Sequence, residues 1–305
     1  MGTRIESVAT AHRLGHVVGR GALHLSDVAA TTCLRRGHHR ASELDLLISA
    51  GIYKDHNAAE PALASIIQDD IGANRGNPPR LGHHGTFSFD VVNGGCGVVT
   101  AAQLIAAFVG PGGPGSAQLG LIVAADADPS PRTSRGYPFS PAGGAVLIGH
   151  ADGDTGFQRF EIRTFPEHAP MFEIELRWDP RAGLVHRGRN VLEVYEAPGF
   201  AGCCVDRASE VAHDLLASVA LSPADIDLVI ASQYPRGFGV SVARRLGIPI
   251  DRLPDVPAAL ASAHTAGPIA ALEAAVRSRR FARARHTLFV TAGAGITIGA
   301  AVYRA

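Results

Sequence analysis

The sequence has no excess of charge of either sign, because 28 Lys and Arg residues stand against 28 Asp and Glu residues. This balance supplies no basic surface for a nucleic acid or an anionic membrane, so we expect neither as a partner. No apolar run approaches the roughly 20 residues that span a bilayer. The first residues also lack the basic and apolar regions of a signal peptide. We therefore expect a cytoplasmic protein.

Cysteine is scarce, and its spacing excludes two classes of protein. The four cysteines are Cys33, Cys96, Cys203 and Cys204. They show no metal-ligand spacing, and in a chain of 305 residues they make no disulfide framework. We expect reduced thiols, no metal and no cofactor. Apolar residues are plentiful, at 46%, which is enough for one large or two ordinary domains.

Strand and helix patterns alternate along the chain, and the second half repeats the order of the first. Residues 225–231 resemble residues 43–49, residues 261–276 resemble the stretch 93–108, and residues 299–302 resemble residues 144–147. Three matches in one order predict an α/β protein of two similar halves, 1–150 and 151–305. Chance similarity between common strand patterns is the alternative.

The segment 88–109 runs from a short apolar strand through Gly94 and Gly95 into good helix formers, so Cys96 falls at a strand-to-helix corner. The free N–H groups and the dipole at a helix start stabilise a thiolate and lower the pKa of a thiol. The glycines let a substrate approach the backbone. Cys96 is therefore a candidate nucleophile, and a buried structural cysteine is the alternative.

His264 lies at the equivalent corner of the second half, just before the predicted helix 269–276. If a pseudo-twofold axis relates the halves, Cys96 and His264 face each other across the join. The imidazole would then take the thiol proton or stabilise the thiolate. A histidine packed in the core or at a helix start is the alternative.

With these residues in place, the chain resembles the thiolase superfamily, and within it the β-ketoacyl-acyl-carrier-protein synthase III-like condensing enzymes. The resemblance covers nearly the whole length, and four segments carry it: residues 90–97, 225–247, 264–275 and 291–304. It implies a five-layer αβαβα fold and a homodimer. It also implies that Cys96 accepts the acyl group, with backbone N–H groups of Cys96 and of the Ala294-Gly295 turn as the oxyanion hole.

The chain departs from the family pattern in three places. Ser232, followed by Gln233, stands where the family has its catalytic histidine, and a serine cannot replace imidazole at neutral pH. His264 stands where the family has an asparagine, so one imidazole is kept in the other position. The insertion that grips coenzyme A is missing, although Arg13 and Arg20 are possible phosphate ligands. An acyl carrier protein thioester thus becomes relatively more favoured than a coenzyme A thioester.

Two further groups are candidates on the strength of the resemblance. Glu60 aligns with a loop that crosses the dimer interface in this family, and in related head-to-head condensing enzymes a glutamate there resembles a base. The alternative is a first-turn glutamate favoured by the helix dipole. Arg244 and Arg245 align with a basic pair that meets acyl carrier proteins, and a solvated helix face is the alternative.

These observations predict an acyltransferase of the ketosynthase III-like kind in a specialised fatty-acyl or secondary-metabolite pathway. An acyl thioester would load Cys96, and carbon–carbon bond formation would follow. An ester- or amide-forming acyltransferase of the same fold, a hydrolase, and a catalytically silent scaffold for an active paralogue are the alternatives.

Overall fold

Two sheets built from successive parts of the chain form the body of the computed structural model, which describes residues 2–12, 21–57, 60–73, 85–109, 117–130, 134–151, 153–181 and 189–305. The first sheet has the order β1-β5-β4-β2-β3 and the second has the order β6-β11-β10-β9. The strands of the first sheet are β1 (Gly2–His12), β2 (Leu46–Ser49), β3 (Phe87–Asp90), β4 (Leu119–Asp126) and β5 (Ala142–Ala151). Those of the second are β6 (Gly156–Thr164), β9 (Leu228–Ala231), β10 (His286–Gly293) and β11 (Thr297–Arg304).

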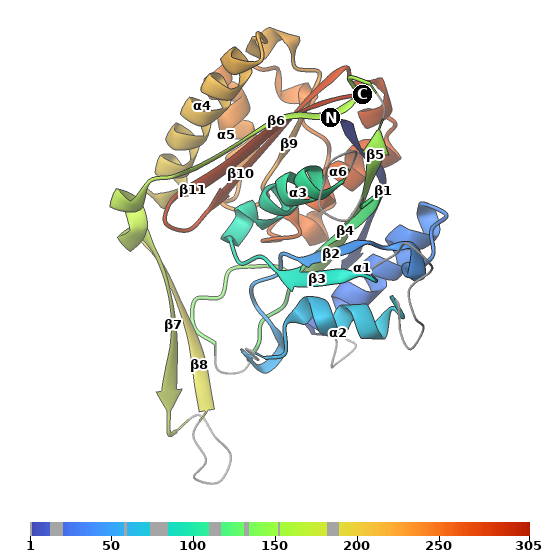
Figure 1. The fold of residues 1–305 in the computed structure, drawn as a ribbon. Helices are drawn as coiled ribbons and strands as arrows, with labels where there is room; N and C mark the ends of the chain where they lie inside the picture. Colours follow the sequence, from blue (N-terminus) through green and yellow to red (C-terminus); the bar gives the residue numbers. More distant parts are fainter. Residues whose placement is uncertain are drawn as a thin grey trace.

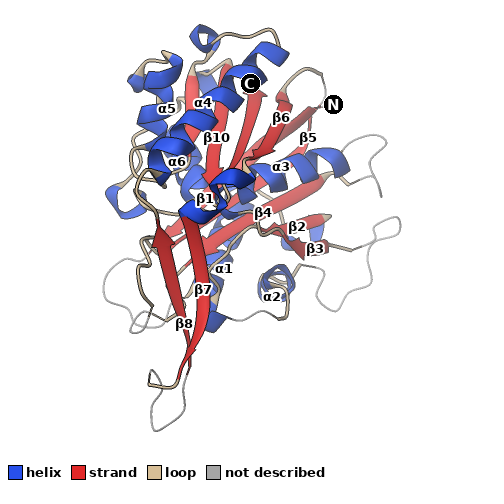
Figure 2. Cartoon of the chain, turned by 90° about the vertical axis from the view of Figure 1, so that its left-hand side faces the viewer, coloured by secondary structure: helices blue, strands red, loops and turns tan. Residues whose placement is uncertain are grey.

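The helices fall into three layers around these sheets. They are α1 (Ala22–Arg36), α2 (Leu63–Asp70), α3 (Gly97–Phe108), α4 (Phe200–Ser218), α5 (Phe238–Leu246) and α6 (Gly267–Arg277). Helices α3 and α6 lie between the sheets, α1 and α2 cover the outer face of the first sheet, and α4 and α5 cover the outer face of the second (Figures 1 and 2). The predicted five-layer αβαβα fold is confirmed. None of the described helices is long and apolar enough to cross a membrane.

The pairing of strands repeats between the halves, as the sequence repeat predicts. In the first sheet β2 is parallel to β4 and β4 is antiparallel to β5, and in the second β9 is parallel to β10 and β10 is antiparallel to β11. Asp45 and Asp227 hold equivalent positions. Asp45 accepts hydrogen bonds from the N–H groups of Gln118 and Leu119, and Asp227 accepts them from Arg285 and His286.

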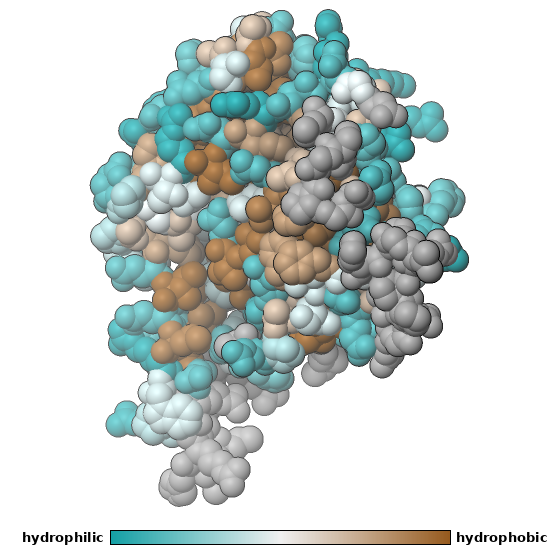
Figure 3. All heavy atoms as spheres, in the orientation of Figure 1, coloured by the Kyte–Doolittle hydropathy of each residue, from teal (hydrophilic) through white to brown (hydrophobic). Residues whose placement is uncertain are grey.

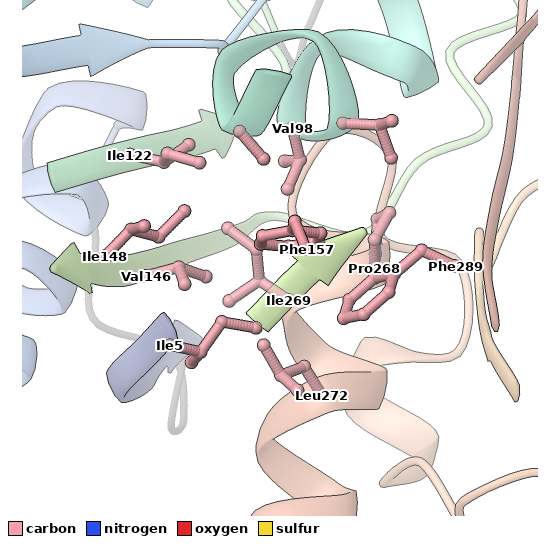
Figure 4. Close-up of a pocket in the computed structure, with 12 residues that line it drawn as sticks. Ile5, Val98, Ile122, Val146, Ile148, Phe157, Pro268, Ile269, Leu272 and Phe289 are labelled. Carbon is pink, nitrogen blue, oxygen red and sulfur yellow. The ribbon is translucent and has the colours of Figure 1, made fainter. Parts of the chain in front are cut away.

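One apolar core joins the two halves around α3 and α6. Its side chains enclose a small cavity of about 20 Å³, to which both sheets and both central helices contribute (Figure 4). Val98 and Val99, in the first turn of α3, meet Ile269 of α6 here. Close packing around this turn fixes the position of the residue that precedes it, which is Cys96.

A hairpin that the sequence analysis did not predict projects from the body. It consists of β7 (Phe172–Asp179) and β8 (Arg189–Glu196) (Figure 1). Its strands pair antiparallel, and Ile174, Leu176 and Trp178 are exposed along one face of β7. Alternate residues of β7 thus give the strand one apolar face, and no described layer covers that face.

The outer layer of the first half carries an acidic group that makes stability depend on pH. Burial raises the pKa of Asp27 on α1 to about 7, and the Asp70 carboxylate on α2 adds to this rise. Because the folded pKa is above the unfolded one, this contribution to stability is complete below about pH 4 and is lost as pH rises through about 7. We expect Asp27→Asn to stabilise the protein at pH 8 by about 1–2 kcal/mol, after allowance for screening of a half-exposed side chain. Urea unfolding at pH 4 and pH 8 tests this, and an equal effect at both values would contradict it.

Candidate active site

Cys96 lies at the predicted corner between β3 and α3. Gly94 has a φ of +50°, and a β-carbon on Gly95 would lie 2.2 Å from the carbonyl oxygen of Ala292 on β10. Only glycine tolerates both conditions. The chain therefore turns tightly against the second sheet, and Cys96 becomes the N-cap residue of the central helix α3.

The resting thiol of Cys96 is neutral, which corrects the expectation of a lowered pKa. Its Sγ is fully buried and lies 3.1 Å from the carbonyl oxygen of Thr297 and 3.6 Å from that of Thr291, so its one S–H can donate to either. Burial raises the pKa of the Cys96 thiol to about 12. Loss of solvation thus outweighs the favourable start of α3, because a thiolate facing carbonyl oxygens has no compensating charge.

The backbone groups expected to bind an oxyanion lie on both sides of this corner. The N–H of Cys96 donates to the carbonyl oxygen of Asn93 at 3.0 Å. Ala294 and Gly295 form the turn between β10 and β11, and a β-carbon on Gly94 would lie 3.5 Å from the Ala294 nitrogen. The turn therefore packs against the Cys96 corner, with Ala294 exposed.

Ser232 and Gln233 follow β9 and link the two corners. Ser232 is buried, its Oγ accepts a hydrogen bond from the N–H of Ala292 at 3.2 Å, and it lies 3.7 Å from the β-carbon position of Gly95. Gln233 donates from Nε2 to Ala231 and packs against Gly267 at the start of α6. Ser232 is therefore a neutral, buried side chain that lies beside the segment of Cys96.

His264 is paired with a buried carboxylate that the sequence analysis did not select. Its Nδ1 lies 3.3 Å from Oδ2 of Asp126, its side chain is only 10% exposed, and its ring stacks on Phe139 with centroids 4.2 Å apart. Cys96 and His264 share no hydrogen bond among the described residues. The described residues also contain no group of three His, Cys, Asp or Glu side chains that could hold a metal ion.

The carboxylate of Asp126 accepts hydrogen bonds from residues of both halves. Its Oδ1 accepts hydrogen bonds from the N–H groups of Ile52 and Tyr53, and its Oδ2 accepts them from the N–H and hydroxyl of Thr265. Burial acts to raise its pKa, but His264 and these donors hold the pKa of Asp126 below its ordinary value. The sequence does not reveal this role of Asp126, because its hydrogen-bonding partners lie far away along the chain.

Glu60 is exposed and precedes α2 by three residues, so it is not a first-turn glutamate. The start of α2 is instead stabilised by Asp90, which accepts hydrogen bonds from the N–H groups of Leu63 and Ala64 and pairs with Lys54 at 2.7 Å. The helix-dipole explanation for Glu60 is therefore wrong, and its role as a base from a second subunit stays a prediction.

Arg244 and Arg245 lie exposed at the end of α5. Arg245 pairs with Asp206 of α4. It also borders an open groove of about 270 Å³ between α4 and α5, which Arg236, Phe238 and Ser241 help to line. Arg13 and Arg20 lie outside the described residues.

The chain is similar in sequence to known proteins. Residues 216–305 match the family described as 3-Oxoacyl-[acyl-carrier-protein (ACP)] synthase III C terminal. The β-ketoacyl-[acyl-carrier-protein] synthase III of Xylella fastidiosa (strain 9a5c) is 28% identical over 309 residues, which cover 97% of this chain and 87% of that protein.

Solved structures share the fold at lower identity. The 3-oxoacyl-[acyl-carrier-protein] synthase III from Aquifex aeolicus VF5 is 18% identical and superposes with a TM-score of 0.76 over all of both chains. The priming β-ketosynthase from the R1128 polyketide biosynthetic pathway is 16% identical, with a TM-score of 0.78 over 99% of this chain and 96% of that one. At these identities the superpositions establish the fold.

Proposed function

We propose that the chain, which is similar to β-ketoacyl-acyl-carrier-protein synthase III and shares its fold, is a thiolase-superfamily condensing acyltransferase that works through an acyl group on Cys96. The observation that carries this proposal is the position of Cys96. It is the N-cap residue of the buried central helix, turned against the β10–β11 turn of the other half. A specialised fatty-acyl or polyketide pathway and a cytoplasmic location are part of the proposal.

In the first step a base takes the Cys96 proton, and Sγ forms a bond to the carbonyl carbon of an acyl thioester. The carbon–sulfur bond to the donor thiol then breaks, and the leaving thiolate takes a proton. A neutral thiol of high pKa needs this base, and we assign the role to His264, which precedes α6 at the corner that corresponds to the Cys96 corner of the first half. The Asp126 carboxylate 3.3 Å from Nδ1 would orient the ring and stabilise an imidazolium.

The oxyanion of this step would be held by the N–H groups of Cys96 and of the Ala294-Gly295 turn. The N–H of Cys96 already donates to Asn93, so the substrate oxygen would have to compete with that bond or share it. In the second step a malonyl thioester would lose carbon dioxide, and the resulting carbon nucleophile would form a bond to the carbonyl carbon of the acyl group. The bond from that carbon to Sγ would then break, and the Cys96 thiolate would take a proton back. Ser232 and Gln233 lie between the two corners and would contact this second substrate as neutral polar groups.

We include a homodimer in the proposal because apolar side chains reach the surface together. Figure 3 shows apolar residues gathered over the middle of one face and toward the hairpin. The exposed residues include Phe87 of the edge strand β3 and Val92, which are 57% and 69% exposed, as well as Leu176 of the hairpin. A second subunit paired along β3 would cover such a surface and bring its Glu60 loop toward the site.

We expect the carrier of the acyl group to be recognised by Arg244 and Arg245. Reversing both charges in Arg244→Glu/Arg245→Glu should slow acyl transfer from an acidic carrier protein by about 10- to 100-fold at low salt, because charged rims set association rates. Transfer from a coenzyme A thioester should fall much less. The matched control is Arg277→Glu/Arg283→Glu, which reverses two exposed charges elsewhere. Equal losses in both double variants would contradict the assignment.

The proposed function is tested by identifying the product of the reaction. The protein is incubated with an acyl thioester and a malonyl thioester, and the mixture is analysed for a covalent acyl adduct and for a β-keto product. An adduct with a β-keto product supports condensation. An adduct with only ester, amide or free acid supports the other acyltransferases or a hydrolase, and no adduct with any donor supports a silent scaffold.

A further inference from the structure

An aromatic box includes His264, and its members come from three separate segments. Tyr53 follows β2, Tyr137 and Phe139 lie between β4 and β5, and His264 precedes α6. Tyr53 packs against Tyr137, Phe139 and His264 with ring centroids 5.0, 5.3 and 5.5 Å apart. Tyr137 also packs edge-on against Phe139 at 5.3 Å. Both halves therefore build one enclosed aromatic surface beside the candidate base.

Two hydroxyl groups in this box are buried without a partner. Tyr53 is only 4% exposed, and neither its hydroxyl nor that of Tyr137 has a hydrogen-bond partner among the described residues. A buried donor left unpaired costs about 1–3 kcal/mol. Phenylalanine would fill the same space without this cost. The two hydroxyls therefore point to a ligand that pairs with them.

The protonation of the two tyrosines and the charge of Asp126 determine which chemical group of the ligand can pair with the hydroxyls. Burial and the nearby Asp126 carboxylate raise the pKa of both tyrosines, so each hydroxyl stays protonated and can donate. The Asp126 oxygens are already engaged by Ile52, Tyr53 and Thr265. Two donors enclosed by aromatic rings are complementary to an oxygen that accepts hydrogen bonds on an otherwise apolar group.

We propose that Tyr53 and Tyr137 bind an oxygen substituent on the acyl group, so that the protein selects oxygenated acyl thioesters, such as 3-hydroxyacyl or 3-oxoacyl thioesters, over saturated ones. This inference rests on the proposed function, because it places an acyl group beside His264. Sites built to pair with a substrate oxygen discriminate strongly, since the analogue without it leaves the donors unpaired.

Binding is measured by calorimetry in a Cys96→Ala background, so that the result does not depend on covalent loading. The probes are butyryl-, 3-hydroxybutyryl- and acetoacetyl-coenzyme A. We expect at least about tenfold tighter binding of an oxygenated probe than of butyryl-coenzyme A. Tyr53→Phe and Tyr137→Phe should each reduce this ratio several-fold, and the double variant should bring it close to one.

The control is Tyr195→Phe, which removes the hydroxyl of a tyrosine that is 55% exposed on the hairpin and should leave the ratio unchanged. Thermal unfolding adds a second readout. Because the two hydroxyls are unpartnered, Tyr53→Phe and Tyr137→Phe should melt at the same or a higher temperature. Equal binding of all probes, no binding of either oxygenated probe, or an unchanged ratio in both phenylalanine variants overturns the inference. Absence of an adduct on wild-type Cys96 counts separately, against the proposed acyl-enzyme.

Discussion

Cys96→Ala is expected to abolish the covalent acyl adduct that intact-protein mass measurement detects on the wild type. The expected loss is at least about 10³-fold in loading rate, because the variant keeps the fold of the corner but has no nucleophile. Cys203→Ala is the matched control, since it removes a partly exposed cysteine from α4 and should load normally. An adduct of equal mass on Cys96→Ala would show that another group is acylated and would remove Cys96 from the mechanism.

The pH dependence of this loading reports how the thiol loses its proton. Burial raises the pKa of Cys96 to about 12, so without a base the thiolate fraction rises about tenfold per pH unit below that value. We expect His264→Ala to load about 10²–10⁴-fold more slowly near pH 7 and to recover steeply as pH rises. The wild type should show a shallower rise. Parallel pH profiles for the two proteins would contradict base catalysis by His264.

Asp126→Asn is expected to cost the largest amount of stability of any single polar change at the site, about 2–4 kcal/mol in denaturant unfolding. The amide keeps one oxygen, but its NH₂ group would face N–H donors that now bond to the carboxylate. The variant should also load Cys96 more slowly, because the ring of His264 loses the charge 3.3 Å from Nδ1.

The direction in which stability changes with pH distinguishes a charged Asp126 from a side chain that acts only by packing. The folded pKa of Asp126 lies below its unfolded value, so its contribution to stability is present above about pH 4 and is lost as pH falls further. The difference between wild type and Asp126→Asn should therefore shrink in acid. Asp128→Asn is the control, because Asp128 is partly exposed and, within the part of the chain that the structure describes, its carboxylate accepts hydrogen bonds from Ser130 and Ser134. A difference that does not vary with pH would contradict a charged Asp126.

Local patterns were sufficient to predict the elements that hold the candidate site. Gly94 and Gly95 ahead of a run of helix formers predict the corner at Cys96. The repeat of Asp45 at Asp227 anticipates equivalent strand starts, which the hydrogen bonds of both aspartates confirm. These features depend on neighbours in the chain, so the sequence contains them directly.

Other properties depend on residues brought together only by folding. The sequence does not distinguish the surroundings of Tyr53 and Tyr195, yet Tyr53 is enclosed beside His264 and Tyr195 is exposed on a hairpin. In the repeated stretch 43–49 the strand β2 begins only at Leu46, after a 3₁₀ turn whose last residue is Glu43. Local propensity does not fix such a boundary, because pairing with β3 and β4 decides where the strand begins.

The sequence by itself determined the alternation of strands and helices, the twofold repeat and the position of Cys96 at a helix start, because each follows from periodicity and from glycine. Only the tertiary structure decided the chemical state of the site. The pKa of Cys96 is high because the second sheet buries its thiol, and Asp126 becomes the partner of His264 because β4 ends where α6 begins in space. Solvation and pairing of charges depend on surroundings that distant segments supply, and these decide which groups carry a proton.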